Sequence, residues 1–207
     1  MDSIYEKAFF FIVGHGRGWV FSSIDLLTKF KRSQADNILS MLVKENQIRR
    51  ISRGLYDYPK YSDLLQKELS PDIEQIANAI ARKFNWRIMI SGESALNILG
   101  VSTQVPGKYS FLSDGPNRAY HIMENIEITF KKAALKNSGF KYRQSALIVQ
   151  ALKALGKERV SLEVIETIRK HIDPKMYTKI LKDSQTSTAW IYEYIKEICK
   201  EEGSKSE

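Results

Sequence analysis

The sequence predicts an α+β fold with a small sheet and a helical C-terminal part. Three observations predict it. Two short amphipathic segments followed by a hairpin pattern occupy residues 22–59, short β-type segments alternate with helical ones from 87 to 130, and helical stripes dominate from 145 to 201.

The segment Ser22–Pro59 has the most specific pattern. Its second predicted helix carries four apolar residues at i, i+3, i+4 and i+7, which form one stripe: Ala35, Ile38, Leu39 and Leu42. Residues 48–58 then form two strand patterns that meet at Arg53-Gly54, where glycine allows the positive φ of a tight turn. Two helices followed by a basic hairpin predict a winged helix-turn-helix.

The opposite face of that helix is polar and has the chemistry of a DNA reader. Asparagine and glutamine amides pair bidentately with adenine, serine hydrogen-bonds several base edges, and neighbouring cations suit phosphates. Residues 29–53 hold seven Lys or Arg against two acids, so 7 − 2 = +5. The candidate DNA-binding residues are Lys31, Arg32, Ser33, Gln34, Asn37, Ser40, Lys44, Arg49, Arg50 and Arg53. An interaction module that binds only protein is the alternative.

The remaining elements follow from the chain in order. A helix over 3–13 buries Ile4, Ala8, Phe11 and Ile12, and GHGRG at 14–18 ends it; without Gly-Lys-Ser/Thr this loop is not a P-loop. Ser22 or Ser23 caps a helix to Phe30, and Ser70 caps a helix beginning at Pro71. Further strands are expected at 87–91, 109–113 and in a hairpin over 118–130, and further helices at 93–99, 145–155, 161–171, 174–182 and 187–201.

These elements suggest four parts of the chain. We expect a winged helix-turn-helix domain at 1–60, a linker at 61–70, a mixed α/β domain with a helical C-terminal part at 71–201, and a disordered tail at 202–207. The length of 207 residues suits two modest domains.

Composition limits the classes of function. A net charge of +8 favours a polyanionic partner. The N-terminus resembles neither a signal peptide nor a spanning helix, and a single cysteine fits a reducing compartment, so we expect a cytoplasmic protein without a membrane partner. The three histidines share no ligand spacing and Ser94 lacks a nucleophile-elbow motif, so we expect no metal, no cofactor and no enzymatic activity.

A second basic run follows the predicted hairpin. Residues 131–160 hold eight Lys or Arg against Glu158 alone, so 8 − 1 = +7. This excess suggests a second anion-facing surface, against the alternative of an ordinary solvated helix face. Its candidate residues are Lys131, Lys132, Lys136, Lys141 and Arg143.

Four stretches together resemble the AbiEi-type antitoxins of the type IV toxin–antitoxin class. They are RGLYDYP, PDIEQIANAIARKF, SGESALNILGVSTQVPGKYSFLSDGPNR and ITFKKAALKNSGFKYR. The resemblance implies an antitoxin linked with abortive infection and phage defence. It further implies repression of its own operon through operator DNA, and a C-terminal domain that opposes a cognate nucleotidyltransferase-like toxin.

Two other functions remain open from the sequence. A winged-helix transcriptional regulator could carry an effector-binding C-terminal domain. An enzyme acting on nucleic acid is disfavoured because Asp72-Glu74 and Glu124-Glu127 fit a helix start and a turn better than a metal site.

Overall fold

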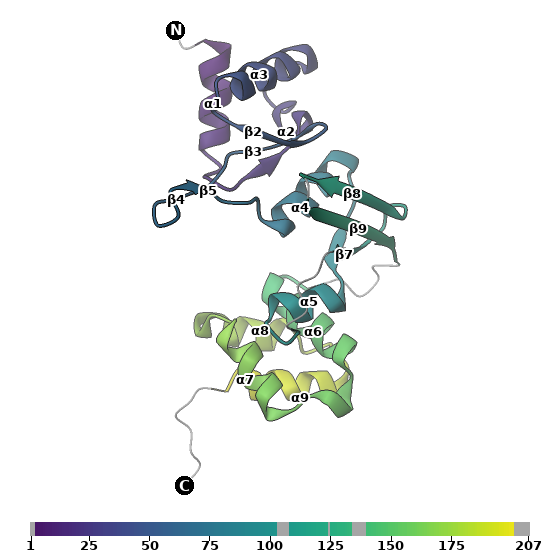
Figure 1. Cartoon of the computed structure of the whole chain (residues 1–207). Helices are drawn as coiled ribbons and strands as arrows, with labels where there is room; N and C mark the ends of the chain where they lie inside the picture. The colour runs from purple at the N-terminus through teal and green to yellow at the C-terminus, as the bar shows by residue number, and fades with distance from the viewer. Residues whose placement is uncertain (1–2, 103–107, 124, 134–139, 201–207) are drawn as a thin grey trace. The chain divides into compact units, whose positions relative to one another are not determined.

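The computed structural model describes residues 3–102, 108–123, 125–133 and 140–200. Helices make up 49% of these described residues and strands 18%, with helices at the C-terminal end, which confirms the α+β class. The chain forms two compact units: Met1–Ile88 with Ala119–Ile128, and Met89–Arg118 with Thr129–Glu207. Each unit is described by itself below, with the elements labelled in Figure 1.

The first unit contains the predicted succession of helix, helix and hairpin. Its elements are α1 (Ile4–Val13), β1 (Val20–Phe21), α2 (Ser23–Leu26), α3 (Arg32–Lys44), β2 (Arg49–Ser52) and β3 (Leu55–Asp57). The strands form an antiparallel sheet in the order β1-β3-β2, so β3 is central and β2 lies at an edge (Figure 1).

The core of this unit follows the predicted stripes, except that Ile4 is exposed and Phe11 is only partly buried. Ala35, Ile38, Leu39 and Leu42 of α3 are all buried, and they pack with Ala8 and Ile12 of α1 in one apolar cluster. Ile4 was predicted to be buried but is 45% exposed. Because eight residues correspond to a rotation of about 80° around a helix, Ile4 does not share the inward direction of Ile12.

Helix α4 (Ile73–Phe84) packs in the first unit, although the sequence suggested that it opens the second domain. The Arg82 guanidinium donates to Asp25 of α2 at 2.6 Å and to the carbonyl of Val20 at 2.8 Å. Its N-cap is Asp72, whose carboxylate accepts the Gln75 N–H at 2.9 Å, and not Ser70 as predicted. An aspartate two residues further along makes the same cap and leaves Pro71 outside the helix.

Two hairpins complete the first unit. The predicted linker 61–70 contains the strands β4 (Tyr61–Ser62) and β5 (Lys67–Glu68), which pair with each other. The end of β8 (Arg118–Ile122) reaches the edge strand β2: the Met123 N–H donates to the Ile51 carbonyl at 3.1 Å. The hairpin β2–β3 is therefore supported along its outer edge.

The second unit is mainly helical beside a small sheet. That sheet has the strand order β6-β7-β9-β8 and draws on residues of both units. The further elements are β6 (Ile88–Ile90), α5 (Gly92–Ile98), β7 (Lys108–Ser113), β9 (Ile126–Lys132), α6 (Arg143–Leu155), η1 (Lys157–Arg159), α7 (Leu162–Lys170), η2 (Pro174–Met176), α8 (Tyr177–Asp183) and α9 (Ala189–Ile198).

A glycine allows the close approach of α5 and α6. A Cβ on Gly92 would lie 2.4 Å from the Cβ of Ala154 and 2.7 Å from the carbonyl oxygen of Gln150. Ser91 caps α5 by accepting the Ser94 N–H, and the Ser94 hydroxyl accepts the Ser110 N–H at 2.9 Å. The predicted tail 202–207 lies outside the described residues.

Candidate nucleic-acid interface

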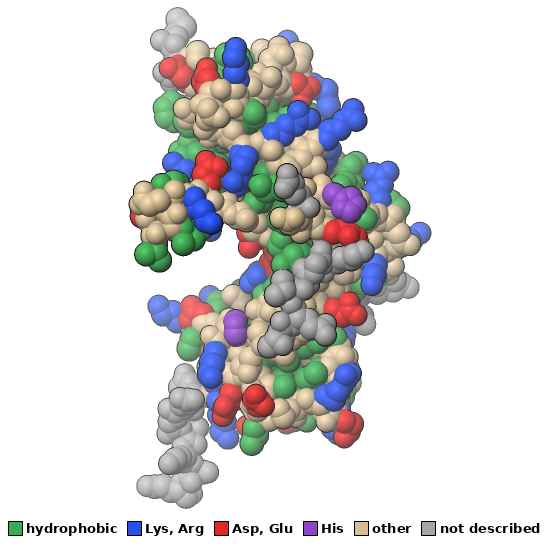
Figure 2. Space-filling view, viewed as in Figure 1, with side chains coloured by type: hydrophobic (Ala, Val, Ile, Leu, Met, Phe, Trp, Pro, Cys, Tyr) green, Lys and Arg blue, Asp and Glu red, His purple; other side chains and the backbone are tan. Residues whose placement is uncertain are grey.

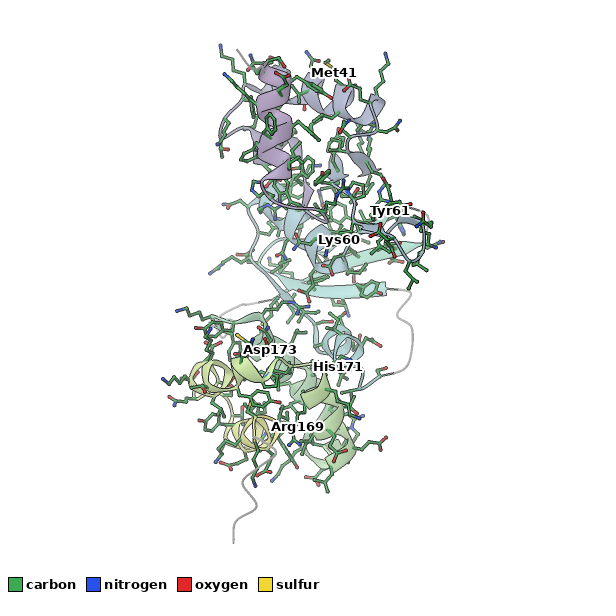
Figure 3. All side chains as sticks on the ribbon, turned by 90° about the vertical axis from the view of Figure 1, so that its left-hand side faces the viewer. Met41, Lys60, Tyr61, Arg169, His171 and Asp173 are labelled. Carbon is green, nitrogen blue, oxygen red and sulfur yellow. The ribbon has the colours of Figure 1, made fainter. Side chains whose placement is uncertain are left out.

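Helix α3 exposes the polar face that the sequence assigned to DNA reading. Ser33, Asn37, Ser40 and Lys44 are exposed, while the apolar stripe on the other side is buried. Met41, which lies beside them, is 49% exposed (Figure 3). A thioether chain there offers the apolar contact that a thymine methyl group accepts, beside amide and hydroxyl groups for base edges.

Cations surround the first turn of this helix. Arg32 opens α3 and Lys31 precedes it, and both side chains are exposed. Gln34 is partly committed to the helix itself, because its Oε1 accepts the Lys31 backbone N–H at 3.1 Å. Gln34 is also half-buried whereas Asn37 is exposed, which makes Asn37 the better-placed amide.

The turn of the β2–β3 hairpin has the predicted geometry. Gly54 has φ of 71°, the left-handed conformation that a tight turn needs. Arg53 at this turn and Arg50 on β2 are both exposed. Lys and Arg side chains gather where this hairpin turns (Figure 2).

Arg49 does not belong to this exposed set, contrary to the sequence prediction. Its guanidinium donates to both carboxylate oxygens of Asp57, at 3.0 and 2.7 Å, and also to Glu68 at 3.2 Å and the Leu69 carbonyl at 2.9 Å. The Asp57 side chain is only 1% exposed. Burial raises the pKa of the Asp57 carboxyl, and the hydrogen bonds from Arg49 act in the opposite direction. Arg49 is thus a structural cation.

Lys83 is a residue that sequence reasoning missed. It lies in the last turn of α4, half-buried, with its Nζ 3.0 Å from where a Cβ of Gly54 would be. Burial lowers the pKa of Lys83, and the charge of Arg53 lowers it further. Two cations held together at one turn suit an anion such as a phosphate. Nothing in the local sequence of α4 shows that it reaches the hairpin.

The glycine-rich loop 14–18 has a structural role in the described unit. Arg17 donates to the Pro59 carbonyl at 2.9 Å and lies over the Tyr58 ring, with 4.6 Å between its guanidinium carbon and the ring centroid. A Cβ on Gly18 would meet the Lys60 side chain at 2.6 Å. The loop is therefore tied to the chain that follows β3, which agrees with rejecting a P-loop.

The second predicted basic surface is divided between the end of β9 and the start of α6. Lys131, Lys132, Lys141 and Arg143 are exposed, and Lys136 lies outside the described residues. The carboxylate of Asp183 accepts the backbone N–H groups of Lys141 at 2.9 Å and Tyr142 at 3.0 Å. This carboxylate at the start of α6 satisfies two backbone donors that the helix itself leaves unpaired.

A further lysine joins this second group from α8. The Nζ atoms of Lys141 and Lys179 lie 5.7 and 5.9 Å from the centroid of the Tyr142 ring. The distances fit cation–π contacts on an aromatic side chain. Lys179 was not predicted, since only the fold brings α8 to the start of α6.

The part of the chain that the structure describes contains neither a candidate metal site nor a candidate membrane span. No group of three or more His, Cys, Asp or Glu side chains there is arranged to hold a metal ion. Among the same residues, no helix combines the length and the apolar character needed to cross a membrane.

Comparison with known proteins gives the family of the chain. None of the curated proteins matches it significantly. The sequence profile of DUF6088, described as a family of unknown function, matches residues 11–180, which cover α3, the β2–β3 hairpin and most of the second unit. The chain therefore belongs to the DUF6088 family.

Proposed function

We propose that this protein is a sequence-specific regulator that binds double-stranded DNA through a winged helix-turn-helix formed by α2, α3 and the β2–β3 hairpin. The observation that carries the proposal is the exposed face of α3. That face presents Asn37, two serines and Met41 between the cations at its start and Lys44 at its end. This combination supplies both base-reading and phosphate-binding groups.

The two parts of the proposed interface have different roles. Helix α3 enters the major groove, where Asn37 reads a base edge and Met41 contacts a methyl group. Arg50, Arg53 and the neighbouring Lys83 contact the sugar-phosphate backbone, which sets the position of the protein without reading sequence. Arg49 takes no part, because Asp57 and Glu68 hold its guanidinium.

The resemblance to AbiEi-type antitoxins supports a more specific proposal. The DNA bound is the operator of the protein's own operon, and the second unit opposes a nucleotidyltransferase-like toxin encoded beside it. The exposed side chains of Lys131, Lys132 and Lys141 are the proposed contacts in that unit.

DNA binding is tested with the full-length protein and a labelled duplex from its own upstream region. Fluorescence anisotropy should show tighter binding to this duplex than to a scrambled duplex of equal length. About five phosphate-contacting cations predict that log K falls by roughly 4 to 5 per log unit of salt. Equal affinity for the two duplexes, or no binding, would contradict the proposal.

The antitoxin role is tested by co-expression. An adjacent nucleotidyltransferase-like gene should slow growth when expressed alone, and this protein should restore growth. A variant with Asn37 and Arg53 changed to Ala should still restore it if the second unit carries the activity. A growth defect that the wild-type protein leaves unchanged would contradict the antitoxin proposal without touching DNA binding.

A further inference from the structure

The β4–β5 hairpin carries apolar side chains into solvent. Leu64 is 92% exposed, Leu65 is 55% exposed and Tyr61 is 49% exposed. Hydrophobic side chains are visible on this hairpin in Figure 2, and Tyr61 is labelled in Figure 3. A solvent-facing turn is ordinarily built from Gly, Asn, Asp or Ser, so two adjacent leucines at a tip call for an explanation.

The tip is held in one conformation by its own side chains. The Leu65 N–H donates to the Ser62 hydroxyl at 3.2 Å, and the Gln66 amide donates to the Asp63 carbonyl at 2.6 Å. Gln66 adopts a left-handed conformation with φ of 50°. These bonds define the turn that presents the leucines. Partner binding at such a tip costs less ordering entropy than binding at an unstructured loop.

The base of the hairpin is fixed to the first unit. Arg49 of β2 donates to Glu68 at 3.2 Å and to the Leu69 carbonyl at 2.9 Å, while the Leu69 N–H donates to the Lys60 carbonyl at 2.8 Å. In the described part of the chain, β4 and β5 pair only with each other. Both outer edges therefore resemble the exposed edges at which sheets associate.

The balanced charge of the β4–β5 hairpin favours a second copy of this chain as its partner. Residues 60–68 hold Lys60 and Lys67 against Asp63 and Glu68, so 2 − 2 = 0, in a chain whose net charge is +8. Two copies of a strongly basic protein repel each other over most of their surfaces, and the repulsion is absent where charges balance. A neutral, apolar and preorganised projection is self-complementary. We infer that a second copy of this chain docks here, with the two tips packing around a two-fold axis.

Such an interface is small, so association in solution is weak. Two leucines and a tyrosine per copy bury less surface than a stable dimer needs. The pairing strengthens when both copies occupy one duplex, because the second contact becomes intramolecular. The inference does not depend on DNA binding, since the association is measured without DNA.

Sedimentation velocity of the full-length protein tests the inference. The wild type should show a concentration-dependent dimer at up to about 200 μM, in the range expected of weak interfaces. The double variant Leu64→Lys/Leu65→Lys should remain a monomer with an unchanged thermal transition, and Leu162→Lys, at a site 79% exposed in the second unit, should dimerise like the wild type. A monomeric wild type, or equal dimerisation of the tip variant, overturns the inference.

An introduced cysteine provides an independent readout. Cys199 is the sole cysteine of the chain and is 6% exposed, and burial raises the pKa of its thiol to about 11. Leu64→Cys would therefore add the only reactive thiol. Mild oxidation should link this variant into a covalent dimer much faster than Leu162→Cys. Equal rates of cross-linking for the two variants would mean that the tips do not meet.

Discussion

The two basic segments of this protein have a similar excess of positive charge but are built differently. Residues 29–53 carry an excess of +5 and residues 131–160 an excess of +7. In the first segment, the cations border an exposed helix face with an amide and two hydroxyl groups. In the second, the cations that the structure describes lie at the end of β9 and near both ends of α6, which has 13 residues and spans about 20 Å.

The difference shows that a charge count alone does not define a binding surface. The larger excess is dispersed over separate elements, whereas the smaller one surrounds groups that can read bases. Within the smaller set, Arg49 is withdrawn into an ion pair, and Lys83 from a later helix joins instead. A count of charged residues therefore indicates a binding partner only when the structure shows where their side chains lie.

The first prediction separates a structural cation from a binding one. Replacing Arg49 by Met leaves the buried Asp57 carboxylate without its bidentate partner, and should lower the free energy of unfolding by about 3 kcal/mol. Urea denaturation measures the loss. Arg50 lies on the same strand with an exposed side chain. Arg50→Met is therefore the matched control and should change stability by less than about 0.5 kcal/mol. Similar losses for the two variants would mean that Arg49 has no special structural role.

This prediction has a pH signature. Burial already raises the folded-state pKa of Asp57, and removing Arg49 raises it further. Above that pKa, the native variant must bury an uncompensated charge; as pH falls through it, the native state takes up a proton and the penalty disappears. The stability deficit of Arg49→Met should therefore be largest at neutral pH and shrink towards acidic pH. A deficit independent of pH would point to lost packing alone.

The second prediction concerns the reading face of α3. Asn37→Ala should weaken binding to the operator duplex by roughly tenfold to a hundredfold, in line with about 1 to 3 kcal/mol for one bidentate contact. Binding to a scrambled duplex should change little, because the phosphate contacts remain. Competition titrations with both duplexes measure the ratio of affinities. Equal weakening on both would assign Asn37 to the backbone instead.

The sequence predicted the local features of the first unit and missed its long-range contacts. The stripe Ala35 to Leu42 and the turn at Arg53-Gly54 follow from periodicity and from glycine, which are local properties. Helix α4 is held in the first unit by an ion pair between Arg82 and Asp25, which are 57 residues apart. The periodicity of apolar residues does not indicate such a pair. The domain boundary predicted near residue 60 therefore wrongly separates α4 from the elements of the first unit against which it packs.

The same limit applies to the candidate sites. The polar face of α3 could be read from spacing, but the capture of Arg49 by Asp57 and Glu68 requires the register of β2 with β3 and the position of β5. Lys83 and Lys179 were missed because each reaches its neighbours through tertiary packing. Local patterns thus predict which residues of α3 are exposed, and tertiary packing decides which cations lie near them.

The third prediction tests the organisation of the second segment. Burial would raise the pKa of Asp183, but the backbone N–H groups of Lys141 and Tyr142 outweigh it and lower the pKa. Asp183→Ala should cost about 1 kcal/mol of stability through the loss of its hydrogen bonds to these two backbone N–H groups. The contribution is present above the ordinary pKa of 3.8 and is lost as pH falls through the lowered pKa. A deficit of Asp183→Ala that stays the same as pH falls through this range would contradict this role.

The last prediction compares the salt dependence of operator binding when two charges are removed from either basic segment. We expect an effect only for the first segment and its neighbour Lys83. Arg53→Gln with Lys83→Gln removes two phosphate contacts, so the salt dependence of operator binding should fall by roughly 2 log units per log unit of salt. Lys131→Gln with Lys132→Gln removes the same charge from the end of β9 and should leave that slope unchanged. Because both double variants change net charge equally, a general electrostatic attraction would reduce the two slopes alike. Unequal slopes would instead show that DNA contacts depend on where the fold places each cation, since each double variant loses the same two positive charges.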